Sequence, residues 1–162
     1  MSFEKARAYL EARGLAAGAR LFAISSATVA LAAQAVGCAP ERIAKTLSFD
    51  VGGRPVLIVA AGDARIDNAR FKAAFGQKAT MLAPERVEAL VGYSVGGVCP
   101  FGVHDGVTIR LDESLRRFET VFPACGSDNS AVELTIDQLQ RAAEGCRWVD
   151  VCKGWREGAD GR

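Results

Sequence analysis

The segment IAKTLSF, residues 43–49, places a lysine among apolar side chains. In an extended strand alternate side chains share a face, so Lys45 lies with Ile43 and Leu47 rather than with the polar set. A buried ammonium without a partner is unfavourable, so such a lysine binds an anion or a carbonyl, or loses its proton. Two interpretations are open: Lys45 lies in the wall of a binding pocket, or its stem packs while its head reaches water.

A second unusual stretch is VGYSVGGVCPFGV, residues 91–103, which is rich in glycine, apolar and uncharged. A loop that only reverses the chain is usually polar. Glycine also lets the backbone approach a ligand closely and leaves N–H groups free to point at it. The stretch is therefore either the wall of a small pocket or a tight glycine turn without a ligand.

Helices with clear ends are predicted around these two stretches. Most begin at a capping residue or a proline and end at a glycine, and Thr135 with Gln138 forms a capping box. An amphipathic pattern predicts a further helix at the N-terminus. The predicted helices cover residues 1–14, 28–36, 67–75, 84–91 and 135–144.

Extended segments alternate with these helices. The pair at 43–50 and 54–62 is joined at Gly52-Gly53, which predicts a hairpin. The hairpin and the uneven spacing of the strands favour an α+β (mixed α/β) domain with a mixed sheet. The remaining predicted strands cover residues 20–25, 78–82, 107–111, 118–124, 131–135 and 147–152.

Composition narrows the class of protein. The chain has 162 residues, with 20 Lys+Arg and 19 Asp+Glu, which fits one domain and argues against a DNA-binding protein. Five cysteines without an export signal predict free thiols in the cytoplasm. A single histidine and the absence of a CxxC pair argue against a metal site. No apolar run reaches the length of a membrane span, which is about 20 residues. Residues 154–162 are expected to be a flexible tail.

Three segments carry a resemblance to a known family: TVALAAQAVGCAPERIAKTLSF, GYSVGGVCPFG and CGSDNSAVELT, followed by WVDVC. In this order the chain resembles the YbaK family of aminoacyl-tRNA deacylases, also called the prolyl-tRNA synthetase-associated domain. The resemblance covers residues 21–153, so residues 1–153 are expected to be the domain. It implies a mixed, mostly antiparallel, barrel-like sheet surrounded by helices.

The resemblance also implies an activity and a site. The family hydrolyses the ester between a wrongly attached amino acid and the terminal adenosine of tRNA, without a cofactor. The expected partners are the acceptor end of an aminoacyl-tRNA and a synthetase, and the chain is expected to act free-standing on a small amino acid. The family's essential lysine and glycine correspond to Lys45 and Gly97. The expected substrate-binding residues are Thr46, Tyr93, Gly96, Val98, Cys99, Pro100, Phe101, Gly126 and Ser127.

The chemistry of ester hydrolysis assigns roles to some of these groups. Lys45 is expected to anchor the substrate carbonyl or a phosphate, and N–H groups near Gly97 and Val98 to hold the oxyanion. A tRNA hydroxyl could assist the water. Tyr93 or Phe101 could stack on the terminal adenine. The arginines proposed to bind the acceptor end are Arg42, Arg110, Arg116 and Arg117.

Departures from the family and two rival functions remain open. Ala124-Cys125-Gly126 and Ala131 replace the serine-glycine-glycine loop and the aspartate of the cysteinyl-tRNA(Pro) deacylases, so that substrate does not transfer directly. One rival is a cysteine hydrolase with Cys99 as nucleophile and His104 as base. The other rival is a non-catalytic module of the same fold that binds tRNA or a synthetase.

Overall fold

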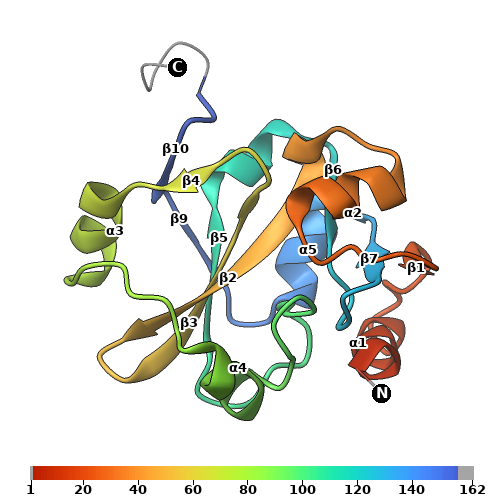
Figure 1. Cartoon of the computed structure of the whole chain (residues 1–162), viewed down its shortest axis with the longest axis horizontal. Coiled ribbons are helices and arrows are strands. Elements are labelled where there is room, and N and C mark those ends of the chain that lie inside the picture. The colour runs from red at the N-terminus through yellow and green to blue at the C-terminus, as the bar shows by residue number, and fades with distance from the viewer. Residues whose placement is uncertain (1, 157–162) are drawn as a thin grey trace.

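The computed structural model describes residues 2–156. Six strands form the main sheet: β2 (Ile43–Val51), β3 (Arg54–Ala61), β5 (Thr108–Asp112), β6 (Thr120–Pro123), β8 (Leu134–Thr135) and β9 (Arg147–Val149). Their order is β8-β6-β2-β3-β5-β9, and the sheet curls into an open half-barrel with helices around it (Figure 1). The predicted α+β domain with a mixed, barrel-like sheet is confirmed.

The hairpin of β2 and β3 lies at the centre of this sheet. Eight residue pairs align the two strands, from Ala44 opposite Ala61 to Val51 opposite Arg54. Gly52 and Gly53 both adopt the left-handed conformation that a two-residue hairpin turn requires. The hairpin predicted from the Gly-Gly pair is confirmed.

The sheet contains fewer antiparallel pairings than expected. Of its five neighbouring pairs, β2-β3 and β6-β8 are antiparallel, whereas β2-β6, β3-β5 and β5-β9 are parallel. Parallel neighbours need long crossover connections, and the segments that carry the helices between these strands supply them. Residue spacing alone did not show which segments return on the same side of the sheet.

Five α-helices surround the sheet: α1 (Ser2–Glu11), α2 (Val29–Val36), α3 (Asn68–Phe75), α4 (Pro84–Val91) and α5 (Ile136–Ala142). Thr28 caps α2 through the Leu31 N–H, and left-handed glycines end α2, α3 and α4, as the sequence predicts. The capping box of Thr135 and Gln138 is present, but α5 ends at Ala142, earlier than the predicted stop at Gly145.

Several predicted strands are shorter or divided. Residues 78–82 form no strand, and only Met81 makes an isolated bridge, to Phe49. The segment predicted at 20–25 is β1 (Ala19–Leu21), which pairs with β7 (Ser130–Val132) in a separate sheet. The segment predicted at 147–152 divides between β9 and β10 (Cys152–Lys153), and β10 pairs with β4 (Arg65–Ile66).

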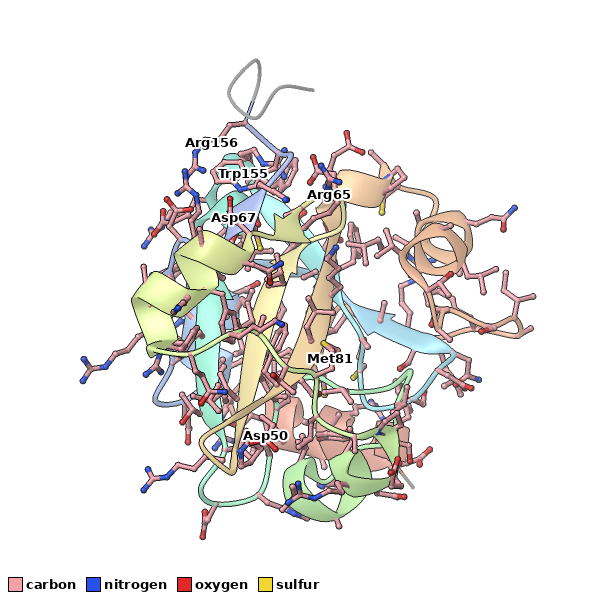
Figure 2. The ribbon with its side chains drawn as sticks, turned by 60° about the vertical axis from the view of Figure 1, so that its left-hand side comes forward. Asp50, Arg65, Asp67, Met81, Trp155 and Arg156 are labelled. Atoms are coloured by element: carbon pink, nitrogen blue, oxygen red, sulfur yellow. The ribbon has the colours of Figure 1, made fainter. Side chains whose placement is uncertain are left out.

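The core covers both faces of β3, in which residues 56–61 are all buried, and it includes side chains of the glycine-rich loop. Tyr93, Phe101 and Phe71 are among the largest fully buried side chains. Figure 2 shows Trp155 and Arg65 at the end of the sheet away from Asp50, which lies near the hairpin turn. No helix in residues 2–156 is long and apolar enough to cross a membrane.

The predicted tail begins with ordered contacts. The indole N–H of Trp155 donates to the Cys152 carbonyl at 3.3 Å, and Arg156 pairs with Asp150 at 2.6 Å. Residues 154–156 are therefore packed on the domain, which corrects the start of the predicted tail. Residues 157–162, the rest of that tail, lie outside the described residues.

Candidate functional site

A cavity of about 530 Å³ lies beside β2. Its walls come from β2, from the segment that leads into α2, from the segment around the start of α4, from the glycine-rich loop and from the strands β6 and β7. Most of the lining is apolar, with hydroxyl groups from several Ser and Thr residues. Of the described residues, Lys45 is the only charged one that lines this cavity.

Lys45 reaches from the cavity toward the chain that follows β3. Its Nζ donates to the carbonyl of Gly62 at 3.4 Å and to the carbonyl of Ala64. The side chain is half-buried, and Lys45 lines the cavity, whereas the two residues that its Nζ contacts do not. The partners are neutral carbonyls, which leave the ammonium charge available to a substrate.

The environment of Lys45 favours loss of its proton. Burial lowers the pKa of the ammonium below its ordinary value, because desolvation disfavours the charged form. Cys152 and Asp63 act in the opposite direction, and Arg65 adds to the lowering. Burial also raises the pKa of the Cys152 thiol well above its ordinary value, so this thiol is neutral and Asp63 is the anion that favours the ammonium.

The glycine-rich loop meets a second loop by close backbone contact. A Cβ atom on Gly97 would lie 2.7 Å from the Cα of Ser127 and 2.8 Å from the carbonyl oxygen of Gly126. The neighbouring loop therefore requires glycine at position 97, for a reason that the sequence did not predict. Gly96 and Val98, on either side, do line the cavity.

The amide of Gly97 is used inside the loop. It donates to the carbonyl of Ser94 at 3.0 Å, which closes a turn. Of the two expected oxyanion donors, the structure therefore leaves Val98 as the candidate.

The loop that contains Gly126 and Ser127 is held by its own hydroxyl groups. The Ser127 hydroxyl donates to Asn129 Oδ1 at 2.8 Å and lies 2.9 Å from the Ser130 hydroxyl. Ser130 lines the cavity, but Gly126 and Ser127 do not. Their role is to support the wall, because the Gly97 backbone packs on them.

Four further residues expected at the cavity, all in the glycine-rich loop, lie elsewhere. Tyr93, Cys99 and Phe101 are fully buried in the core, and Pro100 is also buried. The Tyr93 hydroxyl donates to the Phe101 carbonyl, which fixes the loop from behind. The chain turns inward after Val98, so only the first part of the apolar run faces the cavity, and neither aromatic ring is available to stack on adenine.

Thr46 lines the cavity as expected and has an unusual hydroxyl group. Its Oγ1 is buried and has no hydrogen-bond partner among residues 2–156. A buried hydroxyl without a partner is unfavourable by about 1–3 kcal/mol. A single rotation about χ1 exchanges this hydroxyl with the methyl group, so Thr46 can present either to the cavity.

The arginines proposed for tRNA are all engaged within the domain. Arg42 bonds Thr120 and stacks over Phe122, which lines the cavity. Arg110 donates to the Ile109 carbonyl, and Arg116 pairs with Glu113 at 2.9 Å. Arg117 pairs with Asp63. Of the four, Arg42 is the one that contacts a residue of the cavity wall.

The structure does not bring Cys99 and His104 together as a nucleophile and its base. Cys99 is fully buried, and burial raises the pKa of its thiol to about 12, which disfavours the thiolate. The ring of His104 contacts the Ala89 carbonyl through Nδ1 at 3.1 Å. Among residues 2–156 no group of His, Cys, Asp and Glu is placed to hold a metal ion.

Sequence reasoning missed much of the cavity wall. Ser26–Val29 enter it because the Ser26 N–H donates to the Asp128 carbonyl at 2.6 Å and ties this segment to the late loop. The Thr28 cap was the one available signal, but it indicated a helix start only. The other missed lining residues are Ala32, Ile43, Ala44, Leu47, Ser48, Met81, Leu82, Pro84, Val87, Val95, Phe122, Ala124, Ser130 and Ala131.

The fold and the site together define an α+β half-barrel domain with a lysine-bearing cavity. Residues 25–142 match the family described as the aminoacyl-tRNA editing domain, and the chain belongs to this family. The resemblance to the YbaK family is confirmed.

Relatives of known sequence or structure support this assignment. The uncharacterized protein YwhH of Bacillus subtilis is 53% identical over 135 residues, which cover 83% of this chain and 86% of YwhH. EbsC of Enterococcus faecalis, a candidate Cys-tRNA(Pro)/Cys-tRNA(Cys) deacylase, is 28% identical over 70% of each chain. A solved structure described as a candidate trans-editing enzyme for prolyl tRNA synthetase superposes with a TM-score of 0.84 at 29% identity, covering 94% of this chain and 98% of that one.

Proposed function

We propose that this protein is a free-standing deacylase that hydrolyses the ester of a small, wrongly attached amino acid on tRNA. The observation that carries the proposal is Lys45, the single charged residue among the described residues that line the cavity of an aminoacyl-tRNA editing domain. Two relatives support this reaction class: EbsC is described as a candidate Cys-tRNA deacylase, and the similar solved structure as a candidate trans-editing enzyme.

The geometry supports a mechanism based on positioning and charge. Lys45 anchors the substrate carbonyl or the 3′-terminal phosphate, and the Val98 N–H is the candidate donor to the tetrahedral oxyanion. One such donor typically contributes about 3 kcal/mol to transition-state stabilisation. Within residues 2–156, none of the lining residues has a carboxylate or an imidazole to act as a base, so a ribose hydroxyl of the tRNA is proposed to assist the water.

The cavity wall favours a small, uncharged acyl group such as alanine or serine. The residues that line the cavity include several that are small and apolar, among them Ala44, Gly96 and Ala131. An extra methylene changes binding by only about 1–3 kcal/mol in such a cavity, so selection among small residues is expected to be incomplete.

A panel of mischarged tRNAs tests this proposal. The wild-type protein is expected to hydrolyse alanyl- and seryl-tRNA faster than arginyl- or tryptophanyl-tRNA. The uncatalysed rate of each ester in the same buffer is the control. Efficient hydrolysis of the two bulky esters, with the small ones untouched, would contradict the proposed substrate class.

A non-catalytic binding module is the second candidate. The presence of both Lys45 and Gly97, the residues that correspond to the family's essential lysine and glycine, favours the enzyme over this alternative. Filter binding and hydrolysis measured on the same acyl-tRNA separate the two. A binding module is expected to bind the acyl-tRNA without hydrolysing it.

Replacing Thr46 with valine is expected to separate activity from stability. Valine keeps the shape and removes the unpartnered Oγ1, so the free energy of unfolding should stay equal or rise by up to about 1 kcal/mol. If the hydroxyl binds substrate after rotation, hydrolysis of seryl-tRNA falls in the same variant. Urea unfolding and deacylation rates measure the two effects, and loss of stability together with full activity would contradict this assignment.

A further inference from the structure

The chain that follows β3 holds the ammonium of Lys45. The carbonyls of Gly62 and Ala64 accept its two hydrogen bonds. Gly62 is itself confined, because a Cβ atom there would lie 2.1 Å from the Pro40 carbonyl oxygen and 2.8 Å from a methyl group of Val29. The position of residues 62–64 therefore sets the position of the Lys45 ammonium.

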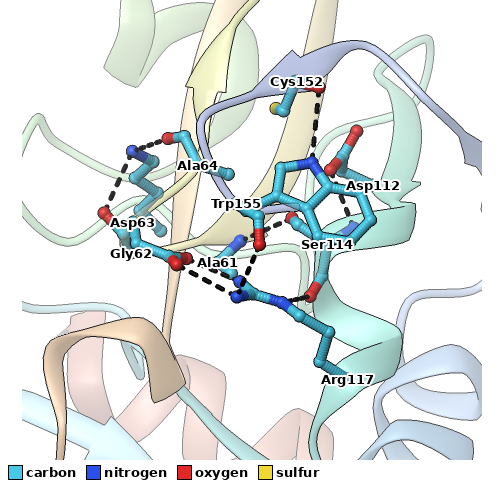
Figure 3. A network of polar contacts seen from close by, with 10 residues as sticks. Ala61, Gly62, Asp63, Ala64, Asp112, Ser114, Arg117, Cys152 and Trp155 are labelled. Atoms are coloured by element: carbon cyan, nitrogen blue, oxygen red, sulfur yellow. Dashed lines mark hydrogen bonds and ion pairs between the residues drawn. The ribbon is translucent and has the colours of Figure 1, made fainter. Parts of the chain in front are cut away.

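An ion pair on the far side fixes these residues. The carboxylate of Asp63 accepts two bonds from the guanidinium of Arg117, from Nη1 at 3.0 Å and from Nη2 at 2.6 Å (Figure 3). This two-point geometry orients both groups, which a single contact does not do. The two side chains are only 28% and 30% exposed, so the pair is partly shielded from solvent.

Arg117 is in turn held by backbone carbonyls of two other segments. Its Nε donates to the Ser114 carbonyl at 2.9 Å, and its Nη1 also reaches the Trp155 carbonyl at 3.3 Å. The Ser114 hydroxyl accepts from the Ala61 N–H, directly before residues 62–64, at 3.1 Å. Figure 3 shows the guanidinium of Arg117 between Asp63 and the carbonyls of Ser114 and Trp155.

A buried carboxylate, that of Asp112, holds these two segments together. Asp112 is fully buried and accepts from the N–H of Ser114 and of Val151, both at 2.9 Å. Its contacts join β5 to the segment before β10, from which Trp155 follows. A continuous series of contacts therefore connects Asp112 with Lys45. It passes through Ser114 and the Arg117 guanidinium to the Asp63 carboxylate. The carbonyls on either side of Asp63 in the sequence then hold the ammonium.

We infer that Arg117, acting through Asp63, is the positioning residue for the Lys45 ammonium, and that the two charges of the pair act on this ammonium in opposite directions. Arg117 does not line the cavity, so it has no direct contact with a substrate there. The consequence for catalysis rests on the proposed function. The consequence for Lys45 itself does not, and it can be measured without any tRNA.

The expected sign follows from the groups around Lys45. Asp63 favours its charged form and Arg65 disfavours it, while the Cys152 thiol is neutral. Asp63→Asn removes the favourable charge, so Lys45 should lose its proton at a lower pH than in the wild type. Arg117→Gln removes the cation that offsets Asp63, so Lys45 should lose its proton at a higher pH.

The experiment follows Lys45 by NMR. The sequence has five lysines, at positions 5, 45, 72, 78 and 153, so labelled lysine side chains give few signals, and Lys45→Arg assigns the one at position 45. The Cε signal is titrated in the wild type, Asp63→Asn and Arg117→Gln. Arg141→Gln is the matched control, because Arg141 makes an exposed ion pair with Asp137 within α5 and does not line the cavity. Arg117→Lys keeps the positive charge without the two-point geometry. It is the second variant at this position if Arg117→Gln fails to fold.

The titration midpoints are expected to move in opposite directions in Asp63→Asn and Arg117→Gln, and to stay at the wild-type value in Arg141→Gln and Arg117→Lys. All the Asp63 and Arg117 variants, including Arg117→Lys, should lose about tenfold or more in kcat/KM, since a misplacement of about 1 Å can cost about 100-fold. Identical midpoints, or shifts in the same direction, would overturn the inference, as would full activity in Arg117→Lys. A wild-type protein that hydrolyses no acyl-tRNA would refute the proposed function, while the NMR result still decides the role of the pair.

Discussion

Replacing Lys45 with alanine is expected to reduce deacylation at least about tenfold, which corresponds to about 1.4 kcal/mol of transition-state stabilisation. The reason is that Lys45 supplies the only charge among the described residues that line the cavity. Single-turnover hydrolysis of a small acyl-tRNA measures the effect. The free energy of unfolding should change little. Removing the ammonium abolishes its hydrogen bonds to two carbonyls, but it also removes the cost of desolvating the charge.

Three control variants separate charge from packing and from thiol chemistry. Lys45→Met keeps the stem without the ammonium and should lose as much activity as Lys45→Ala. Lys45→Arg should restore activity only in part, since a planar guanidinium does not replace a compact ammonium. Cys99→Ala should retain most activity, because this thiol is buried in the core. An active Lys45→Met protein would show that the loss in Lys45→Ala came from packing alone.

Replacing Gly97 with alanine is expected to lower both stability and activity. The added methyl group would lie 2.7 Å from the Cα of Ser127, and backbone cannot yield as the end of a side chain can. Overpacking of this kind typically destabilises by about 1–3 kcal/mol. The two loops must separate, which moves Val98 and Ser130 in the cavity wall, so deacylation falls as well. Urea unfolding and hydrolysis rates measure the two effects.

Gly53→Ala is the matched control for the loss of stability. Gly53 lies in the hairpin turn in the left-handed conformation, and a Cβ atom there would meet no other group within 4 Å. The substitution should destabilise by about 1–2 kcal/mol through backbone strain alone and leave activity intact. A Gly97→Ala protein with native stability and normal turnover would show that the contact between the two loops is not needed.

Local signals in the sequence predicted the elements that depend on local chemistry. Thr28, Asp67 and Pro84 mark helix starts, and the structure confirms each. Lys45 was also identified locally, because a charge in an apolar strand is visible from alternation. These features depend on neighbours within a few residues, which the sequence displays directly.

The cavity wall could not be predicted in the same way, because it depends on contacts between distant segments. The apolar run after Val98 turns into the core, and its composition is the same whether it faces a ligand or the interior. The Gly97 requirement arises from Ser127, which is 30 residues away in the sequence. Arg117 was predicted to bind the tRNA acceptor end and Asp63 was not singled out, because only the structure pairs these two residues.

Release of free amino acid from alanyl- and seryl-tRNA supplied in large molar excess over the protein is the most direct test of the proposed function. The wild-type protein should release many molecules of amino acid per protein molecule, and Lys45→Ala should release amino acid at least about tenfold more slowly. Release no faster than in buffer alone, from these and from every other acyl-tRNA tried, would contradict the assignment of this domain as a deacylase.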